Sequence, residues 1–218
     1  MKISVLQPKI IRGNIDNNSK VIQRLLDKSK GEILVLPEYA LTGSLIFDSK
    51  ININEWVLKS KKAKSKLKVK DGKKLLINSI VEIDNQVYNA CELLPTDIKQ
   101  FKLYPDKPEI EAGINPGLKQ TIFEIKNKKF KVVICTDLRY IEQIPTSDLD
   151  FLIFIFHFSD YNFDKAMNNV KKVSNEINLP IIISSLVSDK NIGFSSYIFN
   201  NTVISLSNDE GILEIEIN

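Results

Sequence analysis

Three strand-like runs in this chain each end at a side chain that can take part in chemistry. The runs are Ile33–Glu38, Ile98–Lys102 and Phe130–Cys135, and they finish with a carboxylate, an ammonium and a thiol. A side chain at the end of a buried strand is held rigidly and still reaches a ligand. This pattern requires a fold in which strand ends meet, and it predicts that the carboxylate is a base, the ammonium a charge stabiliser and the thiol a nucleophile.

Strand and helix patterns follow one another along the chain. We expect strands at residues 2–6, 32–36, 75–83, 87–94, 98–101, 121–125, 131–135, 151–156 and 181–186, with short strands between 194 and 217. Helical patterns predict a helix capped within Asp16–Asn18, a lysine-rich helix at Trp56–Leu67 and a third helix at Lys165–Ile177. Many strands with few helices favour an α/β fold in which sheets pack together and helices cover the outside. No repeat or linker divides the chain, so we expect one domain over residues 1–218.

Composition limits the classes of partner. With 43% hydrophobic and 26% charged residues, the chain is typical of a folded globular protein rather than a disordered one. The formal net charge of +3 over 218 residues is too small to indicate a nucleic-acid partner. Much of the basic excess lies in Lys59–Lys74, where no aromatic residues interleave with the lysines, and we interpret this segment as a solvated helix face and turn.

The sequence predicts neither a membrane span nor a signal peptide. Its longest apolar stretch, Phe151–Phe156, is far too short to cross a bilayer, and the N-terminal apolar run is too short for a signal. We therefore expect no membrane partner and a cytoplasmic location.

Cysteine and histidine are scarce. The two cysteines, Cys91 and Cys135, form no CxxC pair and no Cys/His cluster, so we expect neither a disulfide framework nor a metal site. Cys91 lies inside a predicted strand and is expected in the core. His157 is the only histidine, which excludes Ser-His-Asp and Cys-His machinery unless His157 itself serves. A structural role for His157 and a role at the site both stay open.

Five motifs, taken together and in order, resemble the carbon–nitrogen hydrolase (nitrilase) superfamily, in its amidase-like branch. The motifs are Leu36–Gly43 around the glutamate, Tyr88–Ala90, Phe101–Pro105 around the lysine, Val133–Glu142 around the cysteine, and Gly193–Ser195. The resemblance implies a four-layer α-β-β-α sandwich and a cofactor-free Glu-Lys-Cys triad. It also implies hydrolysis of a non-peptide carbon–nitrogen bond through a thioester.

Carried over residue by residue, the resemblance makes Glu38 the general base, Lys102 the charge stabiliser and Cys135 the nucleophile. A second glutamate near the lysine is expected, and Glu109 and Glu111 compete for that place, with a slight preference for Glu111. The chemistry of acyl transfer adds one more group: the backbone N–H of Thr136, next to the nucleophile, is the expected second oxyanion donor.

The chain departs from this pattern after the nucleophile. Few residues separate Glu142 from the strand at Phe151, and Pro145 argues against a full helix there, so the fold is expected to be shortened at this point. The missing helix often contributes to a dimer interface, so a homodimer or higher homo-oligomer is left open. Phe156–Phe158 stands where small or amide residues are more common, which leads to the hypothesis that His157 touches substrate.

The leading function predicted from the sequence is hydrolysis of a small amide or N-carbamoyl compound, because Cys135 is followed by Thr-Asp rather than the Trp-Glu typical of nitrilases. Nitrile hydrolysis and acyl transfer are secondary options. A catalytically degenerate member that acts as a binding or assembly protein is the alternative, and a basic surface-binding module ranks last. The substrate would be selected by the loops Gly43–Ile53, Pro105–Asn115 and His157–Asp164.

Overall fold

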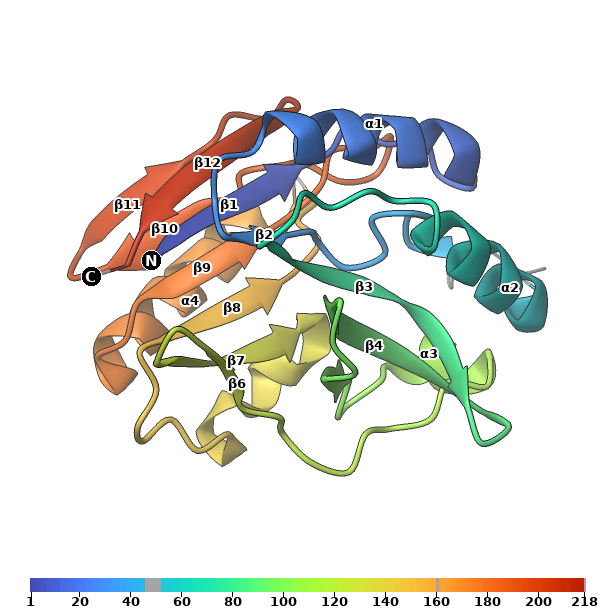
Figure 1. The fold of residues 1–218 in the computed structure, drawn as a ribbon. Helices are drawn as coiled ribbons and strands as arrows, with labels where there is room; N and C mark the ends of the chain where they lie inside the picture. The colour runs from blue at the N-terminus through green and yellow to red at the C-terminus, as the bar shows by residue number, and fades with distance from the viewer. Residues whose placement is uncertain (46–51, 160, 218) are drawn as a thin grey trace.

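The computed structural model describes residues 1–45, 52–159 and 161–217, which form two sheets packed face to face (Figure 1). The first sheet has the order β12-β1-β2-β3-β4-β5, with β1 at Lys2–Gln7, β2 at Ile33–Val35, β3 at Lys74–Ile83, β4 at Gln86–Leu94, β5 at Lys99–Phe101 and β12 at Gly211–Glu216. The second has the order β11-β10-β9-β8-β7-β6, with β6 at Phe123–Ile125, β7 at Lys128–Ile134, β8 at Phe151–Ile155, β9 at Ile181–Ser184, β10 at Ser196–Phe199 and β11 at Thr202–Ser205.

The alternation of side chains along the strands produces three apolar layers. One lies between the two sheets, and one lies between each sheet and its outer helices. On β8, Phe151, Ile153 and Ile155 enter the core between the sheets, whereas Leu152 and Phe154 join the cluster under the outer helix α4. Successive strand side chains point to opposite faces, and here both faces are covered. This explains why the predicted strands read as nearly continuous apolar runs.

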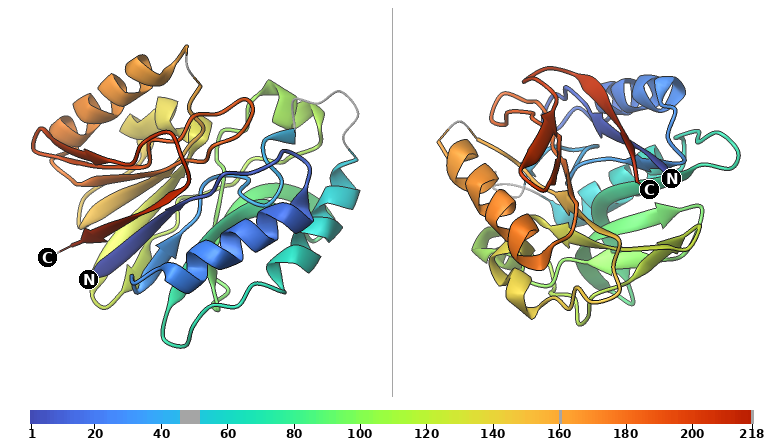
Figure 2. Two further views of the ribbon diagram at one scale, coloured as in Figure 1. Left: turned by 90° about the horizontal axis from the view of Figure 1, so that it is seen from above. Right: turned by 90° about the vertical axis from the view of Figure 1, so that its left-hand side faces the viewer.

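Helices cover the outer faces of both sheets. On the first sheet lie α1 (Ile15–Lys28) and α2 (Ile53–Lys64), and on the second lies α4 (Phe163–Ile177), so the layers run helix, sheet, sheet, helix (Figure 2). The expected four-layer α-β-β-α sandwich is therefore confirmed. None of the helices in the described ranges combines the length and the apolar character needed to cross a bilayer.

The cap of the first helix differs from the prediction. Helix α1 starts earlier than expected, because Asn14 is its N-cap and accepts a hydrogen bond from the backbone of Asn17. Asn18 is instead buried, and its amide donates to the backbone oxygens of Ile11 and Leu41 at 2.9 Å each. Asp16, Asn17 and Asn18 can each cap a helix in isolation. Because Asn18 is buried and bonded to Ile11 and Leu41, all three lie inside α1 and the cap falls on Asn14.

Two short elements were not predicted, and both follow strands that carry candidate residues. Helix α3 (Lys107–Glu111) begins with a capping box between Asp106 and Glu109. The 3₁₀ segment η2 (Cys135–Gln143) starts directly at the cysteine, so β7 ends one residue before the predicted end. No helix occupies residues 144–150, in agreement with the shortening expected after the nucleophile motif.

Candidate active site

Glu38, Lys102 and Cys135 lie together although more than sixty residues separate the first from the second. Glu38 follows β2, Lys102 follows β5 and Cys135 follows β7, and all three line one pocket of about 340 Å³. The sequence-predicted trio is therefore brought together by the meeting of strand ends from both sheets.

The Lys102 ammonium lies between two carboxylates. Its Nζ is 3.1 Å from Oε1 of Glu38 and 2.7 Å from Oε2 of Glu109, and the side chains of Lys102 and Glu38 are only 2% and 3% exposed. Burial alone would lower the pKa of Lys102, but Glu38, Cys135 and Glu109 raise it. Lys102 is therefore a permanent cation, as a buried lysine between two carboxylates must be.

Two asparagines and a tyrosine hold the carboxylates in place. The amide of Asn89 donates to Oε1 of both Glu38 and Glu109 at 2.9 Å. Its own oxygen accepts from Asn78 at 2.6 Å, and the Tyr39 hydroxyl donates to Oε1 of Glu109 at 2.8 Å. These hydrogen bonds fix the positions of the carboxylate oxygens before any ligand binds.

Opposing effects set the charge of Glu38. Burial would raise its pKa, but Lys102, His157 and Asn89 together bring it below the ordinary carboxyl value. Glu38 is thus an anion next to a thiol, the state that a general base requires.

The backbone of Cys135 adopts an unusual conformation. Its φ is +45°, in the left-handed region that residues with a side chain rarely occupy. Burial, and then the negative charge of Glu38, raise the pKa of Cys135 well above its ordinary value. The thiol therefore keeps its proton at rest, and a hydrogen bond to Glu38 contributes to the same shift. The other cysteine, Cys91, is buried in the core as expected.

The second glutamate is Glu109, which corrects the preference for Glu111. Glu111 is 65% exposed at its side chain and lies 3.7 Å from Lys107 on the same helix. The two glutamates are two positions apart on the helix, so α3 directs them to different sides. The capping box at the start of α3 orients Glu109 toward the lysine, and this short helix was not predicted.

The remaining candidates lie around the cysteine. Thr136 is buried and its hydroxyl donates to the backbone oxygen of Tyr104 at 2.6 Å. Asp137 accepts hydrogen bonds from the backbone N–H groups of Leu103 and Tyr104, and burial raises its pKa to about 6. Asp137 thereby fastens the segment after Lys102 to the segment after Cys135. His157 lies in the pocket, with Nε2 at 2.7 Å from the backbone oxygen of Glu38.

All three loops expected to shape the pocket contribute to its wall, although residues 46–51 and 160 fall outside the described ranges. Three residues that sequence reasoning missed, Arg12, Lys190 and Asn191, also line it. Arg12 donates to the backbone oxygen of Ser44 at 3.2 Å. They come from loops without any recognisable motif, so only tertiary packing reveals them.

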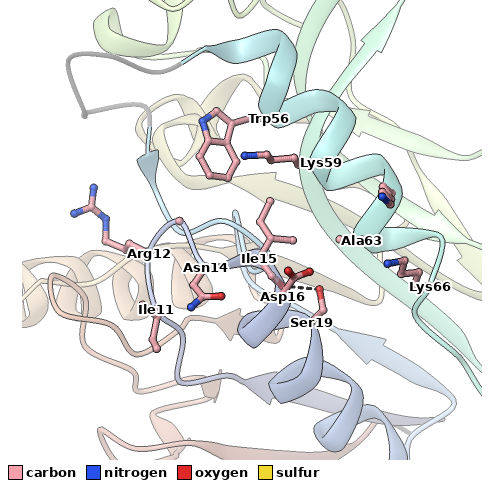
Figure 3. A pocket seen from close by; sticks show the side chains of 12 residues that line it. Ile11, Arg12, Asn14, Ile15, Asp16, Ser19, Trp56, Lys59, Ala63 and Lys66 are labelled. Carbon is pink, nitrogen blue, oxygen red and sulfur yellow. Dashed lines mark hydrogen bonds between the residues drawn. The ribbon is translucent and has the colours of Figure 1, made fainter.

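A larger cavity of about 860 Å³ lies elsewhere, between the start of α1 and helix α2 (Figure 3). Trp56 lies on its wall with Lys59 4.9 Å above the indole ring, and Lys62 and Lys66 also contribute. These three lysines are exposed, as expected of a solvated helix face, but Lys64 in the same segment is only 13% exposed and contacts Glu92. This cavity brings no cysteine or glutamate to its wall. We therefore place the candidate site in the smaller pocket.

Within the described residues, no group of three or more histidine, cysteine, aspartate or glutamate side chains is arranged to hold a metal ion. The carboxylates of Glu38 and Glu109 in the pocket are instead engaged by Lys102, Asn89 and Tyr39.

Solved structures identify the fold. No protein-family model and no curated protein matches the sequence. The amidase from Nesterenkonia sp. matches with a TM-score of 0.79 at 12% identity, over 99% of this chain and 89% of that one. Nit3 from Saccharomyces cerevisiae, a member of branch 10 of the nitrilase superfamily, matches with a TM-score of 0.78 at 16% identity, over 100% and 90%.

A third structure matches only in part of its own length. The glutamine-dependent NAD+ synthetase from Acinetobacter baumannii has a TM-score of 0.81 and 18% identity, over 98% of this chain but 44% of the synthetase chain. This chain thus spans less than half of that protein and about nine-tenths of the other two. The comparisons show that the chain has the fold of the nitrilase superfamily.

Proposed function

We propose that this chain, with its nitrilase-type fold, is a carbon–nitrogen hydrolase of amidase type that acts on a small linear amide or N-carbamoyl compound. One observation carries the proposal: a cysteine with φ of +45° shares a pocket with a buried ammonium that lies within 3.1 Å of two carboxylates. A strained nucleophile beside a fixed base and a fixed cation is the arrangement required for covalent acyl transfer. The nitrilase-type fold of known amidases supports the same class of reaction.

The first half of the proposed reaction forms a thioester. Sγ of Cys135 attacks the amide carbon while its proton passes to Glu38, and the carbonyl oxygen becomes an oxyanion. The tetrahedral intermediate then expels the amine, which takes the proton back from Glu38 and leaves as ammonia or a primary amine. Because the thiol keeps its proton at rest, transfer to Glu38 accompanies attack rather than precedes it.

The second half hydrolyses the thioester. Water attacks the acyl carbon and gives a proton to Glu38, and the thiolate of Cys135 departs and recovers that proton. The product is a carboxylic acid from an amide or a carbamic acid from an N-carbamoyl compound, and both side chains return to their starting states. Glu38 therefore acts as base and acid in turn, which requires that its proton remain exchangeable in each half-reaction.

Positive charge and N–H donors stabilise the oxyanion in this proposal. Lys102 supplies a permanent ammonium, and the backbone N–H of Thr136 is the second donor. Glu109 and Asn89 keep Lys102 and Glu38 in position before substrate arrives. Donors that are already oriented need no reorganisation in the transition state, and loss of one typically costs about 10²–10³ in kcat.

The test is intact-mass spectrometry of the protein after incubation with a panel of small amides, N-carbamoyl compounds and nitriles. We expect an acyl adduct, or release of ammonia, that disappears in Cys135→Ala and persists in Cys91→Ala. The compound that reacts names the substrate class, and a nitrile that reacts where amides do not would overturn the amidase assignment.

Thiol alkylation separates this proposal from the alternative of a binding or assembly protein. An active site predicts that iodoacetamide modifies Cys135 well before the buried Cys91 at neutral pH. Equal and slow modification of the two cysteines, with no adduct across the panel, would favour the binding protein.

A further inference from the structure

His157 is the only histidine in the chain, and it stands at the candidate active site. It follows β8 by two residues, and its side chain is 10% exposed. The proposed mechanism assigns it no step, although its ring contacts Glu38 twice. A nearly buried imidazole with two contacts to the same residue requires an explanation beyond packing.

The two contacts determine where the ring carries its protons. Nε2 lies 2.7 Å from the backbone oxygen of Glu38, and a carbonyl oxygen only accepts, so Nε2 holds a hydrogen and donates it. In the neutral ring Nδ1 is then unprotonated. Yet Nδ1 lies 3.8 Å from Oε2 of Glu38, within ion-pair range of a carboxylate.

This geometry couples the protonation of the two side chains. A protonated ring attracts the Glu38 carboxylate, which is how His157 lowers the pKa of Glu38, whereas a neutral ring presents a lone pair to it. The contact is attractive when the pair carries one proton, on either the ring or the carboxyl group, and at 3.8 Å the attraction is electrostatic rather than a hydrogen bond. Because the two groups interact, proton binding at one affects proton binding at the other.

Other charges face the same pair. Lys102 and Glu109 complete the buried ion cluster, and the thiol of Cys135 lies on the pocket wall. Tyr39 has its ring centroid 6.3 Å from that of His157. The pocket wall also carries the charged or titratable side chains of Arg12, Asp106, Tyr161 and Lys190. Among the described residues that line the pocket, only His157 is a histidine, so its titration can be followed by itself.

We propose that His157 is a positioning residue of the reaction proposed above, one that clamps the backbone of Glu38 through Nε2 and shares the proton of its carboxyl group through Nδ1. When Glu38 receives the thiol proton, its acid form donates to the neutral ring, and the proton then returns through Glu38 to the leaving amine. The exchange is balanced, because His157 ends each half-reaction in its starting state. The inference rests on the proposed function for its catalytic meaning but not for its contacts.

The direct test follows the single histidine by NMR in untagged protein. The ring C–H resonances of His157 are recorded from pH 4.5 to 9 in wild type, Glu38→Gln and Glu111→Gln. Glu38→Gln should move the titration midpoint of the ring to lower pH, because it removes the carboxylate that faces Nδ1. Glu111→Gln removes an exposed carboxylate two residues from Glu109 and should leave the midpoint unchanged. An equal midpoint in wild type and Glu38→Gln would overturn the inference.

A second test measures the rate of Cys135 alkylation against pH in wild type, His157→Gln and His157→Phe. Glutamine can keep a donor near the carbonyl oxygen of Glu38 but does not titrate, whereas phenylalanine removes both functions. In both variants the loss of reactivity on acidification should shift to lower pH, because the first proton must then be taken up by Glu38 itself. At pH 8 only His157→Phe should be clearly slower.

The outcomes of the two tests separate this inference from the proposed function. Wild-type Cys135 that reacts no faster than Cys91 would contradict the proposed function, while the NMR result would still decide the proton sharing. Fast alkylation with the same pH profile in wild type and both variants would leave the function standing and overturn the role of His157.

Discussion

Two groups in this protein contain the same three kinds of side chain in different arrangements. The pocket group consists of Cys135, Lys102 and Glu38, and the β4 group consists of Cys91, Lys64 and Glu92. In each group a lysine contacts a glutamate, and each cysteine lies near a lysine. Only the pocket group brings the thiol to the carboxylate.

Strand alternation separates the members of the β4 group. Cys91 and Glu92 are neighbours on β4, so their side chains point to opposite faces. Cys91 enters the core between the sheets, whereas Glu92 contacts Lys64 of α2 on the outer face. The cavity of about 620 Å³ beside this ion pair is lined by Lys64, Glu92 and Lys99 but not by Cys91.

The thiols differ in what can take their proton. Burial raises the pKa of Cys91 to about 12, an effect that Lys64 only partly offsets. Burial raises the pKa of Cys135 as well. The charge of Glu38 and its hydrogen bond to the thiol raise this pKa further, and Glu38 is the group that can accept the proton. The comparison teaches that residue types alone do not make a nucleophile. The thiol must meet its base, and here that happens only where three strand ends converge.

Replacing each cysteine by alanine should give the largest difference between the pocket group and the β4 group. Cys135→Ala should reduce turnover of the reactive amide by about 10⁴-fold or more, as removal of a covalent nucleophile does. Cys91→Ala should keep turnover and lose about 0.5–3 kcal/mol of unfolding free energy through a core cavity. Ammonia release and urea unfolding measure the two effects. Turnover that survives in Cys135→Ala would refute the pocket group as a catalytic site.

Replacing each lysine by methionine should affect stability unequally. Lys102→Met leaves Glu38 and Glu109 buried without their cation, which should cost about 3–5 kcal/mol of unfolding free energy. Lys64→Met leaves Glu92 with Lys99, whose Nζ is 3.8 Å from it, so a smaller loss is expected. Urea unfolding of both variants measures the difference, and equal losses would show that the two ion clusters are equivalent.

The glutamates of α3 offer a matched pair. Glu109→Gln weakens the charged hydrogen bond to Lys102 and should cost about 1.5–3 kcal/mol of unfolding free energy. Glu111→Gln changes an exposed side chain and should stay within about 0.5 kcal/mol of wild type. Thermal or urea unfolding measures both. A larger loss in Glu111→Gln would restore the preference that the sequence suggested.

The smallest effect concerns acid stability. Burial would raise the pKa of Glu38, but Lys102, His157 and Asn89 bring it below its ordinary value of 4.5. The folded chain therefore binds fewer protons than the unfolded one, and the stability from this ionised group is present above pH 4.5 and lost as pH falls through the lower folded value. Between pH 5 and 3, wild type should lose more unfolding free energy than Glu38→Gln. A steeper loss in the variant would reverse the assigned sign.

Much of the site could be predicted because strand ends are readable in the sequence. The runs before Glu38 and Cys135 are apolar enough to predict burial, whereas the run before Lys102 contains Lys99 and Gln100, and Lys102 was identified by the motif Phe101–Pro105. The choice between Glu109 and Glu111 could not be made this way. It depends on a five-residue helix, too short for a hydrophobic period to show which side faces the lysine.

By itself, the sequence determined the order of strands and helices, the burial of the strands and the three side chains at their ends. Backbone preferences and apolar periodicity act over a few residues, and a sequence displays them directly. Only the tertiary structure decided that Asn89 bridges two carboxylates, that His157 contacts Glu38 and that Cys91 stays apart from any base. These contacts join segments from 20 to 119 residues apart, so they depend on sheet order and on the packing of one sheet against the other.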